Sequence, residues 1–276
     1  MPEPHIEISR ATYGKEAVRV LTWTRDGPLD CVRDVSLGVH IEGEFLASYR
    51  CGDNTAILPS DTLRRHALAE SEENPAGALE ALLTGIATRI LDANPALTAV
   101  AATAHARQWL RLGDHSFARA HWRASAEARL TRGAPVRLRG GARGLELLTT
   151  TGSGFMGFMR DELTIQAEAS DRPLCGTLDA NWTYVAERQP KAGLTEEIVA
   201  GLLSAFADRP SNAVQQLLTE IGTAVLAATA ELATIELHFE SIPAAPIPTA
   251  LSARAAGTAH EIGVGAVGVT DVVLRR

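Results

Sequence analysis

Residues 51–66 read Cys51-Gly-Asp-Asn-Thr-Ala-Ile-Leu-Pro59-Ser60-Asp61-Thr-Leu-Arg-Arg-His66, where an apolar strand end runs into the start of a helix. Ser60 follows a proline and precedes a segment with apolar spacing. It is therefore predicted to be a helix N-cap, with Asp61 in the first turn facing the helix dipole. A hydroxyl, a carboxylate and free backbone N–H groups then meet at one point. Such an arrangement can be no more than a capped helix. Whether it is also a functional site depends on the rest of the chain.

The composition is that of an ordinary soluble globular protein. Hydrophobic residues make up 46% of the 276 residues and the mean hydropathy is +0.01, enough for one large core or two of medium size. No run reaches the roughly 18 apolar residues of a membrane span, and the N-terminus lacks signal-peptide features. We therefore expect a cytoplasmic protein with no membrane partner. The net charge of −7 argues against nucleic acid as the main partner.

The first half of the chain predicts the element order β-β-α-α-β-β. Alternating apolar residues predict a strand hairpin, turning at Asp26-Gly27-Pro28. Two helical segments follow, the second with an apolar stripe that ends at Asn94-Pro95. Two further strands are joined by Gly113-Asp114. The expected strands span 17–24, 32–49, 97–109 and 116–130, and the expected helices span 60–69 and 76–91.

The second half repeats this order of elements without visible sequence similarity, which predicts a tandem architecture. We expect one domain over 10–133 and a second over 134–276. Ser211 is expected to cap the last helix. The expected strands span 136–149, 155–165, 180–187, 234–241 and 263–274, and the expected helices span 195–207 and 211–230.

Short motifs in register along the chain resemble urate oxidase (uricase), a cofactor-free enzyme family that oxidises urate with O2. They are Tyr13-Gly-Lys-Glu-Ala-Val-Arg-Val20, the Ser60-Asp61 pair, Phe155-Met-Gly-Phe-Met-Arg-Asp-Glu162, Asp171-Arg172 and Val214-Gln215. The resemblance extends from about Tyr13 to Pro243. It implies an α+β fold of tandem tunnelling-fold (T-fold) units, each β-β-α-α-β-β, which oligomerise into a β-barrel. It further implies a homotetramer with active sites between subunits.

The resemblance also implies a substrate clamp. Arg172 and Gln215 would read the two ends of a purine's pyrimidinedione ring, because guanidinium and amide groups match its carbonyls and ring nitrogens. Phe155 would stack on the flat face of the ligand. Backbone N–H groups near Asp61 and Val214 would complete the frame.

Each clamp residue also has a plain structural interpretation. Arg172 could form a surface ion pair with Asp171, Phe155 could be a core side chain, and Gln215 could be a solvated helix residue. The residues favour a purine site only as a set that matches the family in register.

Lys15 and Ser60 are the catalytic pair that the resemblance implies. An amine in an apolar or positively charged environment can lose its proton near neutral pH, and a hydroxyl can then relay protons to substrate or water. The family has threonine where this chain has Ser60, so the hydroxyl is kept and a rotamer-restricting methyl is lost. The plain alternative for Lys15 is a charged strand-end residue on a solvated face.

Neither a metal nor a cofactor is expected. The histidines at 105, 115 and 121 lack zinc-site spacing, which argues against the zinc-dependent relatives of the same fold, the GTP cyclohydrolase and pyruvoyl-tetrahydropterin synthase families. No phosphate-binding glycine-rich loop precedes a helix. The cysteines have neither paired nor metal-ligand spacing, which predicts reduced, partly buried thiols at Cys31, Cys51 and Cys175.

One stretch departs from the family pattern. Uricases carry Pro-Asn-Lys-His after the strand that follows the last long helix, and the matching residues here are Pro243-Ala244-Ala245-Pro246. The asparagine that helps to hold O2 or water, and the histidine of the proton relay, are absent. The loss of one positioned acid–base group typically lowers the rate by about 10²–10⁴-fold.

Three hypotheses follow from this departure. The chain could oxidise urate to 5-hydroxyisourate and H2O2 without metal or flavin, with Lys15 and Ser60 performing the proton transfers. It could instead be a diverged enzyme that acts on another purine-like heterocycle in a specialised biosynthetic pathway. It could also be a non-catalytic purine-binding paralogue. Retention of Lys15, Ser60, Arg172 and Gln215 argues against the last, and we expect an oxidoreductase that acts on urate or a closely related purine.

Overall fold

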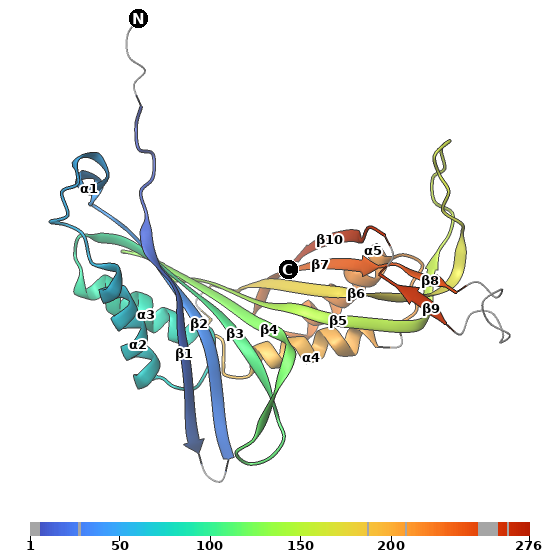
Figure 1. The fold of residues 1–276 in the computed structure, drawn as a ribbon, viewed down its shortest axis with the longest axis horizontal. Coiled ribbons are helices and arrows are strands. Elements are labelled where there is room, and N and C mark those ends of the chain that lie inside the picture. The colour runs from blue at the N-terminus through green and yellow to red at the C-terminus, as the bar shows by residue number, and fades with distance from the viewer. Residues whose placement is uncertain (1–5, 27–28, 187, 208, 248–258, 264) are drawn as a thin grey trace, which may run out of the picture. The chain divides into compact units, whose positions relative to one another are not determined.

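The computed structural model describes residues 6–26, 29–186, 188–207, 209–247, 259–263 and 265–276 (Figure 1). The chain forms two compact units. The first unit contains the described residues of Met1–Gly140 and Ala186–Gly193. The second unit contains the described residues of Gly141–Val185 and Leu194–Arg276. The division into domains at 10–133 and 134–276 stays a prediction.

The first unit is an antiparallel sheet with helices on one face. Its strands follow the order β1-β2-β3-β4, and α2 and α3 cover the sheet (Figure 1). A short helix, α1, precedes them. The elements are β1 (Tyr13–Asp26), β2 (Leu29–Gly43), α1 (Leu46–Cys51), α2 (Ser60–Glu73), α3 (Leu79–Ala93), β3 (Leu97–Arg111) and β4 (Phe117–Thr131).

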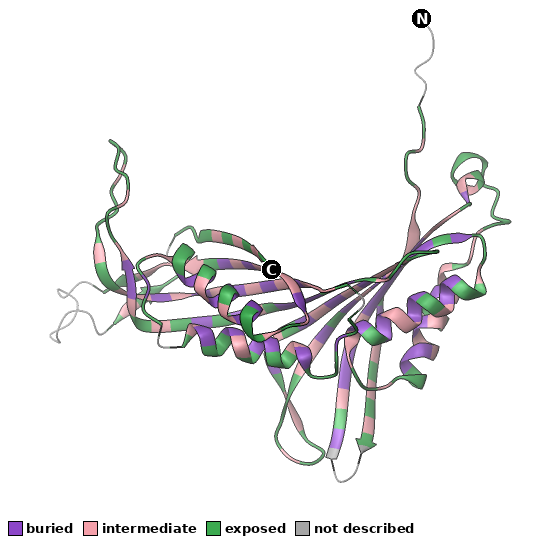
Figure 2. Ribbon diagram, turned by 180° about the vertical axis from the view of Figure 1, so that it is seen from behind, coloured by how far each residue is buried: buried purple, intermediate pink, exposed green. Residues whose placement is uncertain are grey.

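The core of this unit lies between its helices and its sheet. Val35, Leu37, Val39 and Ile41 alternate along β2 and are at most 1% exposed, as expected of a strand with one buried face. The facing leucines and isoleucines of α3 are also buried. Figure 2 shows buried and exposed residues alternating along both kinds of element.

The second unit has the same layering. Its main strands follow the order β5-β6-β7-β10, with α4 and α5 on one face (Figure 1), and a two-stranded ribbon, β8-β9, is added. The fully buried side chains of Trp182 and Phe239 are the largest in its core. The elements are β5 (Arg137–Phe155), β6 (Ala169–Tyr184), α4 (Leu194–Phe206), α5 (Val214–Ala228), β7 (Leu232–Ile242), β8 (Ala244–Pro246), β9 (His260–Ile262) and β10 (Gly268–Arg275).

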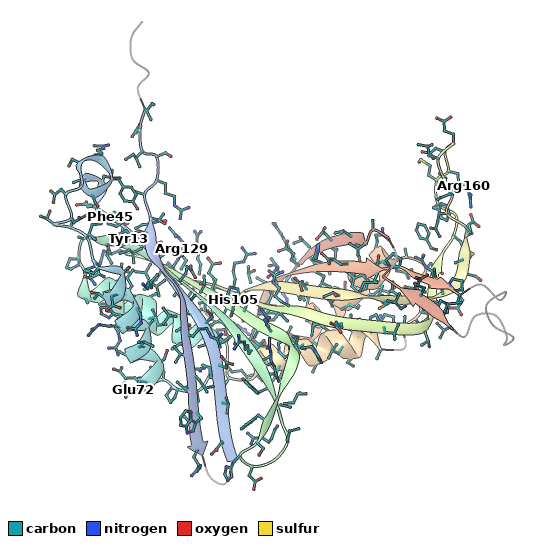
Figure 3. The ribbon with its side chains drawn as sticks, in the orientation of Figure 1. Tyr13, Phe45, Glu72, His105, Arg129 and Arg160 are labelled. Atoms are coloured by element: carbon teal, nitrogen blue, oxygen red, sulfur yellow. The ribbon has the colours of Figure 1, made fainter. Side chains whose placement is uncertain are left out.

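The expected strand over 155–165 is wrong. Strand β5 instead continues through Gly152 to Phe155, and the chain then leaves the sheet. The side chains of Met159, Leu163 and Ile165 are 81–98% exposed, and an Asp161 carboxylate oxygen accepts hydrogen bonds from the Leu163 N–H and the Thr164 hydroxyl, which close a turn. The apolar residues that suggested a strand therefore belong to a projecting arm, on which Figure 3 labels Arg160.

Other expected boundaries also need correction. The expected strand 32–49 ends at Gly43 and gives way to helix α1, where the rings of Phe45 and Tyr49 stack at 6.3 Å, as residues four apart do on a helix. The expected strand 180–187 begins earlier, as β6 at Ala169, and ends at Tyr184. The expected strand over 263–274 begins later, as β10 at Gly268, and ends at Arg275. The short strand β9 precedes it, and Val264 lies outside the described residues.

The cysteines are free, and Cys175 is half-buried as expected. Cys31 and Cys51 are exposed, so the expectation that they are partly buried is wrong. No described group of three or more His, Cys, Asp or Glu side chains is placed to hold a metal ion. None of the described helices has the length and apolarity needed to cross a bilayer.

Candidate active site

Lys15 lies on β1 at a point where the strand is irregular. A Cβ on the preceding Gly14 would lie 2.1 Å from the Val39 carbonyl oxygen, so only glycine allows this approach of β1 to β2. The β1–β2 register shifts between Lys15 and Val18, and Ala17 has a φ of 58°. Such a bulge re-aims nearby side chains, and it leaves Lys15 half-buried.

The strand end that carries Lys15 is fixed to the chain before α2. The Tyr13 hydroxyl donates a hydrogen bond of 2.8 Å to the Leu58 carbonyl oxygen. The Tyr13 ring packs edge-on against Phe45 with centroids 5.0 Å apart, and Figure 3 shows the two side chains together. Tyr13 therefore holds this part of β1 beside the start of α2.

The expectation that Ser60 caps α2 is wrong. Pro59 occupies the cap position, and its carbonyl oxygen accepts from the N–H groups of Thr62 and Leu63. Ser60 is instead the first helical residue, because the fixed φ of proline already sets the helix entry. Its hydroxyl has no hydrogen-bond partner among the residues that the structure describes, so it is available to a ligand.

Asp61 lies in the first turn of α2, as predicted. Its carboxylate accepts from Arg65 Nε at 3.1 Å and pairs with Arg64 at 3.5 Å. The hydrogen bond from Arg65 and the charges of Arg64 and Lys15 hold the pKa of Asp61 below its usual value. The influence of Lys15 on this carboxylate puts Lys15, Ser60 and Asp61 in one neighbourhood of the first unit.

Arg172 and Phe155 come together in the second unit. The guanidinium carbon of Arg172 lies 5.4 Å from the centroid of the Phe155 ring, and the Phe158 ring stacks on Phe155 at 4.7 Å. The Nε of Arg172 is buried and has no hydrogen-bond partner within the described part of the chain. A buried donor without a partner costs about 1–3 kcal/mol, and an acceptor from outside the described residues would relieve this cost.

The alternative ion pair of Arg172 with Asp171 is not formed. Asp171 accepts from the Thr151 hydroxyl at 2.7 Å and from the Gly152 N–H at 2.6 Å. These two bonds lower its pKa, Thr151 having the larger effect. Phe155 is half-buried and so is not an ordinary core residue. Both observations favour a ligand-binding role for the pair.

The expectation that Ser211 caps α5 is also wrong. Its N–H donates to the Gly152 carbonyl at 2.8 Å, and its carbonyl accepts from the Gly154 N–H at 2.7 Å. Helix α5 begins three residues later at Val214. The serine therefore joins the end of β5 to the loop before α5, and so holds the Phe155 region close to the helix start.

Val214 and Gln215 form the first turn of α5, where backbone N–H groups lack partners within the helix. Val214 is half-buried and Gln215 is exposed. The amide of Gln215 has no described hydrogen-bond partner, whereas that of Gln216 donates to Glu220. A pocket of about 350 Å³ lies beside this turn, lined by Asp171, Ser211 and Gln216 among others, but neither Arg172 nor Gln215 lines it.

Sequence reasoning missed three contributors to this arrangement. Gly14 permits the close strand approach, and Phe158 extends the aromatic stack. Ser153 forms a bridge to Ser211, and its buried hydroxyl has no hydrogen-bond partner in the described parts of the chain. Only the Phe-x-x-Phe spacing of 155 and 158 could have been noticed in advance. The other two depend on which strands become neighbours.

A family model described as "Uricase" matches residues 138–261. The uricase of Haloferax volcanii is 30% identical over 265 residues, covering 82% of this chain and 86% of that protein. This chain belongs to the uricase family. The uricase of Arthrobacter globiformis is 27% identical over 234 residues, covering 84% of this chain and 77% of that protein.

Solved structures of the uricase family have the same fold. The crystal structure of uricase from Arthrobacter globiformis matches 99% of this chain and 96% of its own with a TM-score of 0.92 at 24% identity. The crystal structure of a uricase from Bacillus fastidious matches 97% of this chain and 94% of its own, with a TM-score of 0.83. The predicted α+β fold of T-fold units is therefore confirmed, and assembly into a barrel stays a prediction.

Within the uricase-family fold, the departing motif occupies β8. Ala244 is half-buried, Ala245 and Pro246 are exposed, and none of the three side chains can donate or accept a hydrogen bond. The strand pairs with β9, so any polar group at this place has to come from another segment.

Proposed function

We propose that this protein oxidises urate with O2, without a cofactor, to 5-hydroxyisourate and H2O2. The observation that carries the proposal is the buried, unpaired Nε of Arg172 beside the Phe155 ring. A flat ligand with hydrogen-bond acceptors at its edge satisfies both groups at once. Membership of the uricase family supports urate as that ligand.

The proposed clamp uses the edge and the face of the purine. Arg172 donates its planar N–H groups to a carbonyl oxygen and a ring nitrogen, and the Gln215 amide pairs with the other end of the ring. Phe155 stacks on the ring face, which contributes about 1–3 kcal/mol per base in comparable sites. The first-turn N–H groups at Val214 provide further donors in the plane.

Lys15 and Ser60 are the proposed proton-transfer pair. The Lys15 amine accepts a proton, and the unpaired Ser60 hydroxyl passes protons between Lys15 and the substrate or water. Asp61 contributes its backbone N–H at the helix start to the ligand. Its carboxylate pairs with Arg64 and Arg65. One urate, one O2 and one water then give one 5-hydroxyisourate and one H2O2, with two electrons passing from the purine to O2.

We further propose that the protein is a homo-oligomer, a tetramer by family resemblance. In the assembled protein, Lys15, Ser60 and Asp61 of one protomer would face Phe155, Arg172, Val214 and Gln215 of a neighbour. The small-molecule partners are urate and O2. Each site would then need two copies of the chain.

The test is O2 consumption measured together with the loss of urate absorbance, using metal-free protein. We expect one-to-one uptake of O2 and loss of urate. Urate that binds without any O2 uptake would contradict the proposal, and purine analogues altered on the imidazole side would then identify the substrate of a diverged enzyme or a binding protein.

A further inference from the structure

Strands β8 and β9 form a small antiparallel ribbon that continues from β7 (Figure 1). Ala244, Ala245 and Pro246 lie opposite Ile262, Glu261 and His260, respectively. The ribbon is closed at both ends by backbone bonds, from the Ile247 N–H to the Ala259 carbonyl and from the Gly263 N–H to the Pro243 carbonyl, each 3.0 Å long. The register of His260 is therefore fixed on both sides.

This register puts His260 on the same face of the ribbon as Pro246 and Ala244. Directly opposed residues of an antiparallel pair project to one face, with Cβ atoms about 4.5–5.5 Å apart. Residue Glu261, opposite Ala245, projects to the other face. Among the ribbon residues that the structure describes, His260 is thus the one titratable side chain on the Ala244–Pro246 face.

The ribbon starts beside the strand that carries Arg172. Ile242, the last residue of β7, pairs with Cys175 of β6. Arg172 precedes Cys175 by three residues on β6, which is about 10 Å at the rise per residue of a strand. β8 begins two residues after Ile242 and contacts β6. The ribbon therefore extends from the part of the second unit that holds the guanidinium.

His260 is half-buried, and its imidazole has no hydrogen-bond or ion-pair partner among the described residues. A neutral imidazole can accept a proton on one nitrogen and donate from the other. Imidazole is the side chain that most often acts as a general acid or base in enzymes. An imidazole without a described partner, on a ribbon that continues from the strands beside Arg172, is chemically able to take a proton from water.

We propose that His260 supplies the imidazole that β8 lacks and transfers a proton during the hydration step of the reaction. The inference rests on the proposed function. After the urate anion has passed two electrons and a proton to O2, leaving a hydroperoxide anion, the oxygen of water forms a bond to the ring-fusion carbon. The C=N electron pair at that carbon moves onto nitrogen. The proton that leaves water goes to His260 and then to the hydroperoxide, which departs as H2O2, and 5-hydroxyisourate leaves as its anion.

The experiment compares His260→Ala and His260→Gln in the full-length protein, by O2 uptake and urate loss. We expect kcat to fall by about 10²–10⁴-fold, with the KM for urate unchanged. Free imidazole added to His260→Ala should restore part of kcat in proportion to its concentration. The matched control is Glu261→Gln, which removes a titratable group from the opposite face of the same strand and should keep the wild-type kcat.

Three outcomes would contradict this role of His260, and they separate it from the proposed function. Full activity of both His260 variants beside an active wild type would overturn the role of His260 alone. So would a loss of activity that imidazole does not restore, because His260 would then act through the ribbon's structure. A wild-type protein that takes up no O2 with urate would overturn the proposed function, and the role of His260 with it.

Discussion

At the residue scale, the arrangement around Arg172 depends on its neighbour. Asp171 accepts hydrogen bonds from Thr151 and Gly152. The adjacent guanidinium has no ion pair among the described residues and lies over the Phe155 ring. Two adjacent residues of opposite charge would ordinarily suggest a mutual pair. Here the hydrogen bonds from β5 to the Asp171 carboxylate replace that pair, as the proposed clamp role of Arg172 requires.

The first prediction concerns Arg172→Ala. Removing a charge-assisted donor should weaken urate binding by about 1.5–3 kcal/mol, or roughly 10–150-fold in Kd. The measurement is titration calorimetry with urate in the absence of O2. Arg143→Ala is the control, because Arg143 pairs with Asp179 and Asn181 elsewhere in the same unit; an equal loss in both variants would contradict the clamp.

The second prediction concerns Lys15→Met, which keeps the length of the side chain and removes the amine. We expect kcat to fall by about 10²–10⁴-fold while anaerobic urate binding stays measurable. Lys191→Met, in the exposed segment before α4, serves as the control. Unchanged turnover in Lys15→Met would remove this residue from the mechanism.

At the element scale, the site residues are placed by irregularities in strands. Gly14 lets β1 approach β2, and the register shift that follows lies next to Lys15, whose charge acts on Asp61 in the first turn of α2. The β5 strand is held to the loop before α5 by the Ser153–Ser211 bridge. In both units a strand end is thus tied to a helix N-terminus, which brings side chains and backbone N–H groups together.

The third prediction is that Gly14→Ala destabilises the protein by about 1–3 kcal/mol, because the new Cβ would meet a backbone carbonyl oxygen of β2 that cannot rotate away. Urea unfolding measures the change. Gly113→Ala is the matched control: no atom lies within 4 Å of its added Cβ. Equal stability of the two variants would show that β1 can shift without cost.

The fourth prediction concerns the pairing of β7 with β10. The His238 Nδ1 lies 2.7 Å from an Asp271 carboxylate oxygen, and Glu240 is 3.5 Å from Nε2. The hydrogen bond to Asp271, and then that to Glu240, raise the pKa of His238. Asp179 lies opposite His238 on β6 but is paired with Arg143.

A raised pKa in the folded protein stabilises it when the imidazole is protonated. This stabilisation is complete below the ordinary histidine pKa of about 6.5 and is lost as the pH rises through the raised value. We expect this contribution to the free energy of unfolding to fall over that window and to disappear in His238→Gln. Urea titrations at several pH values test it, with the exposed His121→Gln as control; an identical pH dependence in His238→Gln would contradict it.

At the scale of the whole molecule, the candidate site residues are divided between the units. Lys15, Ser60 and Asp61 belong to the first unit, and Phe155, Arg172, Val214 and Gln215 belong to the second. The proposed oligomer joins the two groups across protomers. A symmetric assembly of this kind gives every protomer the same two half-sites.

The fifth prediction follows from this division. Lys15→Met protomers, impaired in kcat, and Arg172→Ala protomers, impaired in urate binding, should together show more activity at low urate when they are co-expressed than either variant shows alone. Some interfaces then combine an intact Lys15 half with an intact Arg172 half. O2 uptake and sedimentation velocity are the measurements. The control pairs Lys15→Met with the Lys15→Met/Arg172→Ala double variant and should show no such gain; a monomeric protein, or no gain in the first mixture, would contradict sites shared between subunits.

The sequence by itself determined the α+β class, most of the strands and helices, and the family, because alternation, helical stripes and short motifs are local properties of the chain. It placed Asp61 in the first turn of α2 for the same reason. The tertiary structure alone decided that Pro59 rather than Ser60 occupies the cap, that 155–165 forms an exposed arm, and that Asp171 bonds to β5 instead of Arg172. It also decided that His260 faces Pro246 across the ribbon. These outcomes depend on which segments become neighbours, and hydrogen bonds between residues far apart in sequence leave no periodic pattern in the chain.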